Sequence, residues 1–340
     1  MNKNRNFYLG LVLVLPLLAS LPFWVQSEYF FFAAYSVLQF VILAVAWNIL
    51  GGYAGYVNFG SAAFFAIGAY STIVGYKLHF PQGANILLGT FMAGLVGLGM
   101  GYITLRLKGV FFSIATLAMS VVLLTIVTNT PFLGGARGVY VIVSRESPIG
   151  TGPYIHWLYF LILAMAVVSV IISRIIEHSW LGQGLMAIRD DEMAAEGLGV
   201  PTLKLKLIAT SISGALMGLA GTTFPYLITY VEPTATFNLS FAVNSIAMPI
   251  VGGLGTWIGP LLGALLLGSI QQIASVTLSS SWNLLIVGGV LVLFVTLAPN
   301  GLVGFFKKWS GNNGKHNSDT NAFSKGQCSD QEIWWFYCLK

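Results

Sequence analysis

Charged residues are scarce in this sequence. Only 8% of its 340 residues are Asp, Glu, Lys or Arg, whereas 56% are hydrophobic, and an ordinary soluble domain is about a quarter charged. Its mean hydropathy is +0.81. This balance excludes an ordinary soluble domain and indicates that lipid is the main solvent of the chain. We therefore predict an all-α fold, a polytopic bundle of transmembrane helices in a lipid bilayer.

Cysteine and histidine are also few, and their positions specify no chemistry. Both cysteines, Cys328 and Cys338, lie near the C-terminus, and none of the four histidines has a partner at metal-ligand spacing. No nucleophile or acid–base pair stands out, and the basic residues form no stripe for nucleic acid. The segment GNNGKH at 311–316 lacks the spacing and the hydroxyl of a phosphate-binding loop. We predict neither an enzyme nor a nucleic-acid binder, with no metal and no cofactor of its own.

Long apolar runs, in contrast, are frequent. A helix needs about 20 apolar residues to cross a bilayer, and counting such runs predicts about ten spans. They lie at residues 7–25, 29–50, 55–76, 86–103, 110–127, 157–172, 207–227, 241–253, 258–276 and 284–297. The eighth is short and contains Asn244 and Pro249, which indicates a broken or re-entrant piece. The first is longer than a secretory h-region, so a retained span is favoured over a cleaved signal peptide.

The basic residues predict how these spans are oriented. If the N-terminus is cytoplasmic, only three of the 16 Lys and Arg residues fall outside, namely Lys77, Arg137 and Arg145. The positive-inside rule favours this orientation. An even number of spans then returns the C-terminus to the cytoplasm. None of the spans holds a charged residue well inside it, so no proton relay is expected.

Two glycine-broken stretches occupy matching positions in the two halves of the chain. They are GGYAGYVNFGSAAFFAIGAY at 51–70 and GGLGTWIGPLLGALLLG at 252–268. Interrupted apolar segments placed in this way point to inverted repeats around a pathway at the membrane midplane. The alternative is that glycine only marks kinks and close helix packing. We expect inverted repeats with broken segments.

The segment MAIRDDEMAAEGLGV at 186–200 interrupts the apolar pattern. It holds five charged residues within positions 189–196 and lies in the predicted cytoplasmic loop between the sixth and seventh spans. The three successive acids at 190–192 are expected in the first turn of a short helix, where the helix dipole favours them, and Gly197 and Gly199 are expected to end it. About eight residues are too few for a helix to be stable alone. A solvated loop helix and a docking element for a cytoplasmic partner fit this pattern equally well.

Beyond residue 308 the sequence becomes polar and rich in Gly, Ser and Asn. We expect a transmembrane domain over residues 1–308 and a disordered cytoplasmic tail over 309–340. The tail ends in the aromatic cluster EIWWFYC, which fits either a contact with the membrane surface or an accident of how the chain ends.

Several ordered blocks resemble one transporter family. The run MAIRDDEMAAEGLGVPTLKLKLIATSISGALMGLAG at 186–221 is similar to the permease subunits of branched-chain amino-acid ABC transporters, the hydrophobic amino-acid and amide family. The resemblance covers about residues 30–305. Its other blocks are 52–70, LRLKGVFFSIATLA at 105–118, the loop 134–138, 252–267 and APNGLVG at 298–304. The sequence departs from the family at Asn58, where Ser is usual, and at Ser61, where His or Gln is common.

The resemblance implies the permease subunit of an ATP-driven importer that carries branched-chain amino acids across the bacterial inner or plasma membrane, with both termini cytoplasmic. The implied partners are ATP-binding subunits, which bind the ATP, a second homologous permease, and a periplasmic or lipid-anchored substrate-binding protein. The segment at about 189–198 is identified as the coupling helix, which is seated on the ATP-binding subunit. Its candidate residues are Arg189, Asp190, Asp191, Glu192, Ala194, Ala195, Glu196 and Gly199.

Polar residues within apolar segments are the candidates for the translocation pathway. They are Asn58, Ser61, Thr116 and Asn244. A pathway without charged groups suits a neutral zwitterion that is met by small polar groups and helix ends. Each residue also fits the more common role of bonding to a neighbouring helix. Urea or a short amide as cargo is an alternative, and so is a sodium-coupled secondary carrier.

Overall fold

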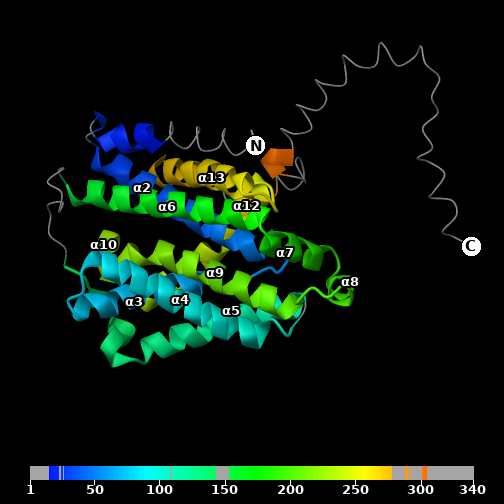
Figure 1. Cartoon of the computed structure of the whole chain (residues 1–340). Coiled ribbons are helices and arrows are strands. Elements are labelled where there is room, and N and C mark those ends of the chain that lie inside the picture. The colour runs from blue at the N-terminus through cyan, green and yellow to red at the C-terminus, as the bar shows by residue number, and fades with distance from the viewer. Residues whose placement is uncertain are drawn as a thin grey trace, which may run out of the picture.

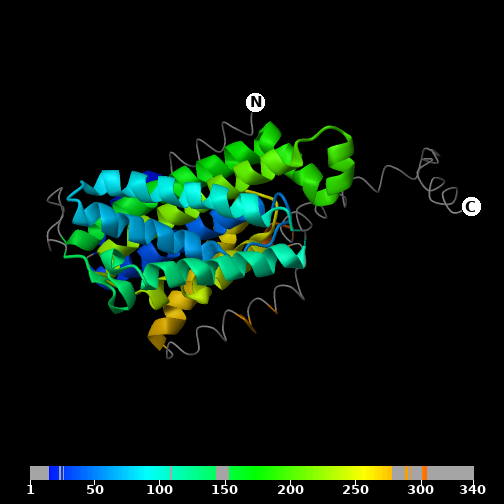
Figure 2. The ribbon, with the colours of Figure 1, turned by 90° about the horizontal axis from the view of Figure 1, so that it is seen from below.

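The computed structural model describes residues 15–22, 24–25, 27–107, 109–142, 153–277, 288–289, 292 and 301–304. In this part the chain is a bundle of helices that lie side by side along one common direction (Figures 1 and 2). Among the described residues, seven helical segments are long and apolar enough to cross a membrane. The prediction of an all-α, polytopic bundle is therefore confirmed.

The main helices of the described residues make up the bundle. They are α2 (Glu28–Leu50), α3 (Ser61–Lys77), α4 (Gln82–Thr104), α5 (Val110–Thr128), α6 (Tyr154–His178), α9 (Thr202–Thr222), α12 (Leu239–Gly252) and α13 (Ile258–Thr277). The shorter helices are η1 (Pro131–Leu133), η2 (Gly135–Arg137), α7 (Trp180–Asp190), α8 (Glu192–Gly197), α10 (Phe224–Ile228) and α11 (Pro233–Thr236). Two short strands, β1 (Val139–Tyr140) and β2 (Tyr230–Val231), pair antiparallel.

The second to the ninth predicted spans each coincide with one of the main helices. The third begins later than predicted, because residues 51–60 are not helical and α3 has only 17 residues. The eighth, predicted to be a broken or re-entrant piece, is instead one continuous helix, α12, with Pro249 inside it; the interruption at Phe237 and Asn238 lies before the predicted span, between α11 and α12. The span 284–297 and the start of the span 7–25 fall largely outside the described residues, and the tail 309–340 lies wholly outside them.

Helix α2 forms the centre of the bundle. All of its residues from Val41 to Leu50 are buried, as expected for a helix that is apolar on every side and enclosed by other helices. Close packing around the centre depends on glycine. A Cβ atom on Gly68 would lie 2.0 Å from the carbonyl oxygen of Gly218 on α9. The backbones of α3 and α9 therefore touch only because Gly68 lacks a side chain, whereas a Cβ atom on Gly218 would collide with Ala93 on α4.

The two glycine-broken stretches lie together at one end of the bundle. Asn48, near the end of α2, donates from Nδ2 to the carbonyl oxygen of Thr256, which follows α12, at 3.0 Å. Helices α2 and α12 therefore enter these stretches in the same direction, whereas an inverted pair would run in opposite directions. The prediction that these two stretches are inverted counterparts is thus corrected.

The helices that oppose α2 and α3 are α9 and α12. The hydroxyls of Tyr35 and Thr223 bond at 2.6 Å, and Ser213 donates to the carbonyl oxygen of Ala46 at 2.7 Å, so α2 and α9 are antiparallel. Helices α3 and α12 are antiparallel in the same way, through a hydroxyl contact at the start of α3 and a stacked aromatic pair farther along it. Helices α9 and α12 therefore run opposite to α2 and α3, an arrangement that the glycine pattern did not mark.

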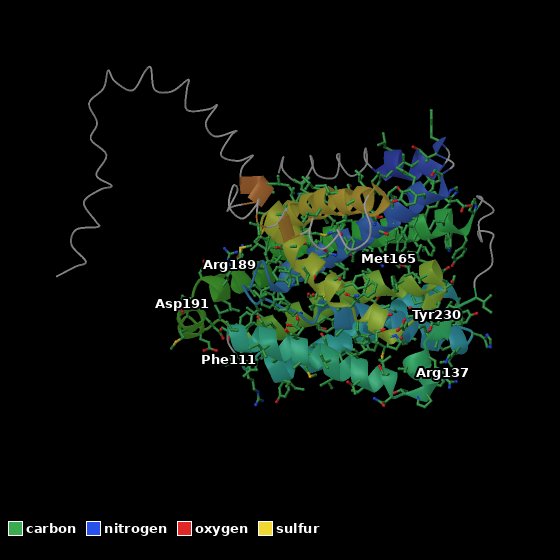
Figure 3. All side chains as sticks on the ribbon, turned by 180° about the vertical axis from the view of Figure 1, so that it is seen from behind. Phe111, Arg137, Met165, Arg189, Asp191 and Tyr230 are labelled. Atoms are coloured by element: carbon green, nitrogen blue, oxygen red, sulfur yellow. The ribbon has the colours of Figure 1, made fainter. Side chains whose placement is uncertain are left out.

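The two ends of the bundle carry different features (Figure 3). Arg189 and Asp191 lie at one end, with α7 and α8, and Phe111 at the start of α5 lies at the same end. Arg137 and Tyr230 lie at the opposite end, beside the β1–β2 pair. We refer to the first as the α8 end and to the second as the sheet end.

Candidate functional site

The acidic segment forms two helices rather than one. Helix α7 ends at Asp190, Asp191 has an extended backbone with φ −158° and ψ 110°, and α8 begins at Glu192. The Asp191 carboxylate accepts from the backbone N–H groups of Met193 at 2.9 Å and Ala194 at 3.0 Å. These are donors that the start of a helix leaves without partners. Arg189 and Asp190 therefore belong to α7, and the short helix starts later than predicted because Asp191 is its cap.

The end of α8 follows the glycine pattern. Gly197 is the last residue of the helix, and Gly199 has φ +85°. A left-handed backbone of this kind is adopted readily by glycine and with strain by other residues. Space is not the reason, since an added Cβ at Gly199 would meet nothing within 4 Å. The turn after α8 therefore depends on the conformational freedom of this glycine.

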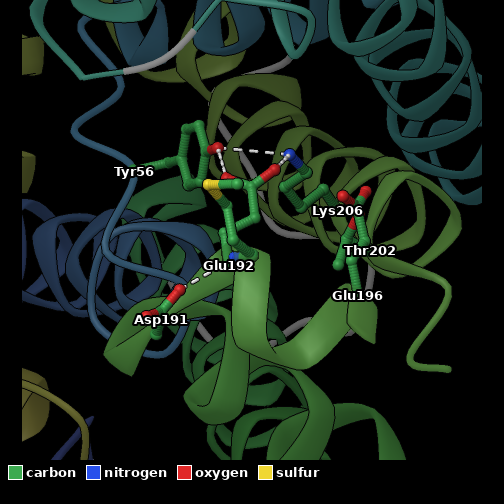
Figure 4. A network of polar contacts seen from close by, with 7 residues as sticks. Tyr56, Asp191, Glu192, Glu196, Thr202 and Lys206 are labelled. Carbon is green, nitrogen blue, oxygen red and sulfur yellow. Dashed lines mark hydrogen bonds and ion pairs between the residues drawn. The ribbon is translucent and has the colours of Figure 1, made fainter. Parts of the chain in front are cut away.

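A buried ion pair connects α8 to α9. Lys206 Nζ lies 2.8 Å from Glu192 Oε1, and the two side chains are 3% and 17% exposed. Tyr56 donates from Oη to Glu192 Oε2 at 2.7 Å, and Lys206 Nζ donates to Tyr56 Oη at 3.1 Å (Figure 4). Each of the three side chains thus contacts the other two. We call Tyr56, Glu192 and Lys206 the Tyr56 cluster.

The protonation of Tyr56 follows from its surroundings. Burial, together with the hydrogen bond to the Glu192 carboxylate, raises the pKa of the Tyr56 phenol above its usual value of 10.0. The phenol therefore keeps its proton at neutral pH and acts as a donor to the carboxylate. Lys206 supplies the opposite charge, and a buried charge is tolerated only when it is paired in this way.

Two further side chains join the glycine-broken stretches at the α8 end. Arg189 Nη1 donates to the carbonyl oxygen of Gly52 at 2.9 Å. Glu177, near the end of α6, accepts at Oε2 from the backbone N–H of Trp257 at 2.6 Å and from Tyr53 Oη at 3.3 Å. Buried non-helical backbone needs partners from the rest of the protein. Helices α6 and α7 supply them to both stretches.

Three of the four predicted pathway residues surround the start of α3. Asn58 Oδ1 accepts from the backbone N–H of Gly60 at 2.7 Å, and Thr116 Oγ1 accepts from that of Phe59 at 3.2 Å. Ser61 follows directly as the first residue of α3, and all three predicted residues are buried. The structure therefore brings Asn58, Ser61 and Thr116 together, with their side chains already bonded within the protein.

The fourth predicted residue is bonded to a different helix. Asn244 Oδ1 accepts from Gln271 Nε2, on α13, at 2.9 Å. Its neighbour Ser245 instead donates to Ser61 Oγ at 2.8 Å. Ser245 therefore joins the group at the start of α3, and it was not among the predicted residues. Ser245 could not be singled out from the sequence, because its neighbour Asn244 is the more unusual residue in an apolar run.

The Tyr56 cluster was also not predicted. Lys206 was assigned to a cytoplasmic loop just before the seventh span, and it proves to be a buried residue of α9. Tyr56 is separated from Glu192 by 136 positions and from Lys206 by 150. No local spacing connects such residues. The only signal available in the sequence was Lys206 itself, a basic residue at the edge of an apolar run.

These features define a class of protein: a multi-pass helical membrane protein with a short capped helix held at one end of the bundle. A family model described as the permease component of the branched-chain amino acid transport system matches residues 29–295. The chain belongs to this family of ABC transporter permeases. The resemblance seen in the sequence motifs is thereby confirmed.

The relatives agree with this assignment. The high-affinity branched-chain amino acid transport system permease protein LivM of Escherichia coli is 27% identical over 320 residues, which covers 87% of this chain and 74% of that protein. LivM of Salmonella typhimurium is 27% identical over 329 residues, with 88% and 75% covered. The ribose import permease protein RbsC of Haemophilus influenzae is 28% identical over 158 residues, with 45% and 48% covered. No solved structure is significantly similar to this chain.

Removal of the Lys206 charge tests the buried ion pair. We expect Lys206→Met to lower the free energy of unfolding by about 3 kcal/mol, because Glu192 would be left partly buried without its cation. The measurement is unfolding of the purified protein in mixed micelles of increasing SDS content. Lys204→Met is the matched control, since Lys204 is exposed on the same helix, and it should change the value by less than about 0.5 kcal/mol. Equal effects of the two variants would contradict the description of the pair.

Proposed function

We propose that this chain is the permease subunit of an ATP-driven importer of branched-chain amino acids in the bacterial inner membrane, and that α8 is its coupling helix. The observation that carries the proposal is the projection of α8 from the end of the bundle (Figure 1). Met193 on α8 and Leu198 directly after it are 76% and 86% exposed. Large apolar side chains on a projecting helix indicate a surface that a partner covers.

The structure refines which residues of α8 would meet the ATP-binding subunit. Ala195 is buried against the bundle, whereas Met193, Ala194 and Leu198 are exposed. The predicted apolar face is thus divided between two sides of the helix. In this proposal Ala195 seats α8 on its own bundle, and the other three residues meet the partner. Asp191 contributes as the cap rather than as a contact.

The orientation is part of the same proposal. A cytoplasmic α8 end is supported by Arg189 at this end and by Arg106, which follows α4 directly and precedes the start of α5 there. The positive-inside rule places such residues in the cytoplasm. The sheet end then faces outward, toward a substrate-binding protein, and both termini are cytoplasmic. A second homologous permease and two ATP-binding subunits would complete the importer.

The proposed cargo is supported by the relatives and by the chemistry at the start of α3. The two LivM proteins are branched-chain amino acid permeases by name. Asn58, Ser61 and Thr116 offer amide and hydroxyl groups without net charge beside the start of α3. Helix starts of this kind favour a carboxylate, and small polar groups suit a neutral zwitterion. We therefore assign these three residues to the translocation pathway.

Charge introduced on the exposed face of α8 tests the docking assignment. We expect the double variant Met193→Asp and Leu198→Asp to weaken association with the ATP-binding subunit about thirtyfold, since loss of a buried apolar anchor costs about 2 kcal/mol. The measurement is co-purification of that subunit in mild detergent. Leu254→Asp is the matched control, because Leu254 is an exposed apolar residue in the connection between α12 and α13. Unchanged recovery of the subunit with the double variant would refute the docking assignment.

Uptake measurements test the cargo and the energy source. We expect proteoliposomes that contain the permease complex and its binding protein to accumulate labelled leucine only when ATP is present on the side of the ATP-binding subunits. Dissipating a sodium gradient should leave the rate unchanged. Labelled ribose and urea serve as controls and should not accumulate. Uptake that follows sodium and ignores ATP would instead establish a secondary carrier.

A further inference from the structure

Helix α8 is not continuous with the helices on either side of it. Asp191 is extended between α7 and α8, and the residues from Leu198 to Pro201 are not helical. A displacement of α8 therefore cannot pass into the bundle along a rigid helix. It must pass through the side chains that tie α8 to its neighbours.

Besides the packing of Ala195, two glutamates bond α8 to different elements. Glu196 Oε1 accepts from Thr202 Oγ1 at 2.7 Å, and this bond leads only to the first turn of α9. Glu192 leads both to α9, through Lys206, and to residues 51–60, through Tyr56. Both carboxylate oxygens of Glu192 are held by these bonds, so the carboxylate cannot rotate freely. The Tyr56 cluster is therefore a stiff connection between α8 and the broken stretch 51–60.

The broken stretch leads from Tyr56 to the start of α3. Asn58 is two positions beyond Tyr56, and its carbonyl oxygen accepts from Trp47 Nε1 at 2.8 Å. The carbonyl oxygen of Val57 accepts from Ser113 Oγ, on α5, at 2.8 Å. Residues 57–59 are thus bonded to α2 and α5, so a movement of Tyr56 is passed to both helices.

The first residue of α3 adds a contact to a third helix. Ser61 Oγ accepts from Ser245 Oγ, on α12, at 2.8 Å. Both side chains are fully buried. A displacement that arrives from Tyr56 therefore reaches the contact between α3 and α12.

We propose that Tyr56, Glu192 and Lys206 form the joint through which movement of α8 reaches the start of α3 and the Ser61–Ser245 contact. They are positioning residues, since none of them touches the cargo or ATP in this proposal. The proposal rests on the proposed function, in which α8 docks on an ATP-binding subunit. It adds that docking alone is insufficient: transport also requires the bond from Glu192 to Tyr56.

The variant Tyr56→Phe tests the joint, because it removes the phenol oxygen and leaves the ring and the ion pair. In proteoliposomes with the ATP-binding subunits and the binding protein, we expect ATP hydrolysis and subunit recovery to persist. The number of leucine molecules transported per ATP should fall about tenfold, as loss of a hydrogen bond to a charged group implies. A purely structural role of Tyr56 would lower transport and hydrolysis together.

Thr202→Val is the matched control. It removes the other tie between α8 and α9 without touching residues 51–60, so the ratio of transport to hydrolysis should stay within about twofold of the wild type. If Tyr56→Phe transported as many leucine molecules per ATP as Thr202→Val, the proposed joint would be refuted. Loss of the ATP-binding subunit from the Tyr56→Phe complex would also overturn it, because Tyr56 would then act on docking.

An exchange of charges provides a second, independent test. Lys206→Glu alone places two carboxylates beside each other and should reduce the transport ratio. Adding Glu192→Lys restores opposite charges, and the Tyr56 phenol is able to bond to either, so the ratio should recover at least in part. Absence of recovery in a double variant that unfolds at the wild-type temperature would contradict the joint. Failure of the proposed function is distinct, since wild-type complexes would then show no ATP-driven uptake at all.

Discussion

In a membrane, a chain departs from helical hydrogen bonding only where other parts of the protein satisfy the freed backbone groups. This constraint governs the α8 end of the bundle. The stretch 51–60 and the connection between α12 and α13 both leave helical structure there, and Asn48 bonds one to the other. Further partners come from charged side chains on α6 and α7 and from Trp47, Ser113 and Thr116 on α2 and α5. The short acidic segment is therefore part of the support of the bundle and not an appendage to it.

This support has a mechanical consequence. The same segment that stabilises the broken stretches also bears α8, whose exposed apolar residues are the proposed docking surface. A partner that moves α8 then acts directly on backbone that is held by side chains and not by a helix. Such backbone is easier to displace than a helix of the bundle interior, because fewer hydrogen bonds must change together. The non-helical stretch 51–60 thus connects the proposed docking surface on α8 to the start of α3.

The sequence predicted the parts of this structure that depend on local pattern. Apolar runs of sufficient length located the main helices, because the requirement to span lipid acts on each run separately. Asp191 and Gly199 likewise limit α8 through their own local chemistry, although the helix was predicted to begin before Asp191. Asn58, Ser61 and Thr116 could be singled out because a polar residue in an apolar run is conspicuous wherever it folds, and the structure brings them together, while their role in a pathway stays a prediction.

What escaped prediction depends on tertiary contacts. Lys206 became part of a buried ion pair because α9 brings it beside Glu192 and Tyr56, and these segments are far apart in the chain. The direction of α12 relative to α2 likewise follows from how many helices lie between them and from how they pack. Glycine spacing alone does not contain that information. The stretches 51–70 and 252–268 were therefore wrongly predicted to be inverted counterparts.

The central claim is that α8 and the broken stretch move as one unit. The most direct measurement is the distance between a spin label on exposed Ala194 and a second label in the stretch 51–60, at Val57, in the assembled complex with and without trapped ATP. A third label at Tyr140 reports on the sheet end. The account predicts that the distance between Ala194 and Val57 stays constant, while the distance between Ala194 and Tyr140 changes. A change in the first distance, with α8 moving away from a stationary stretch, would contradict it.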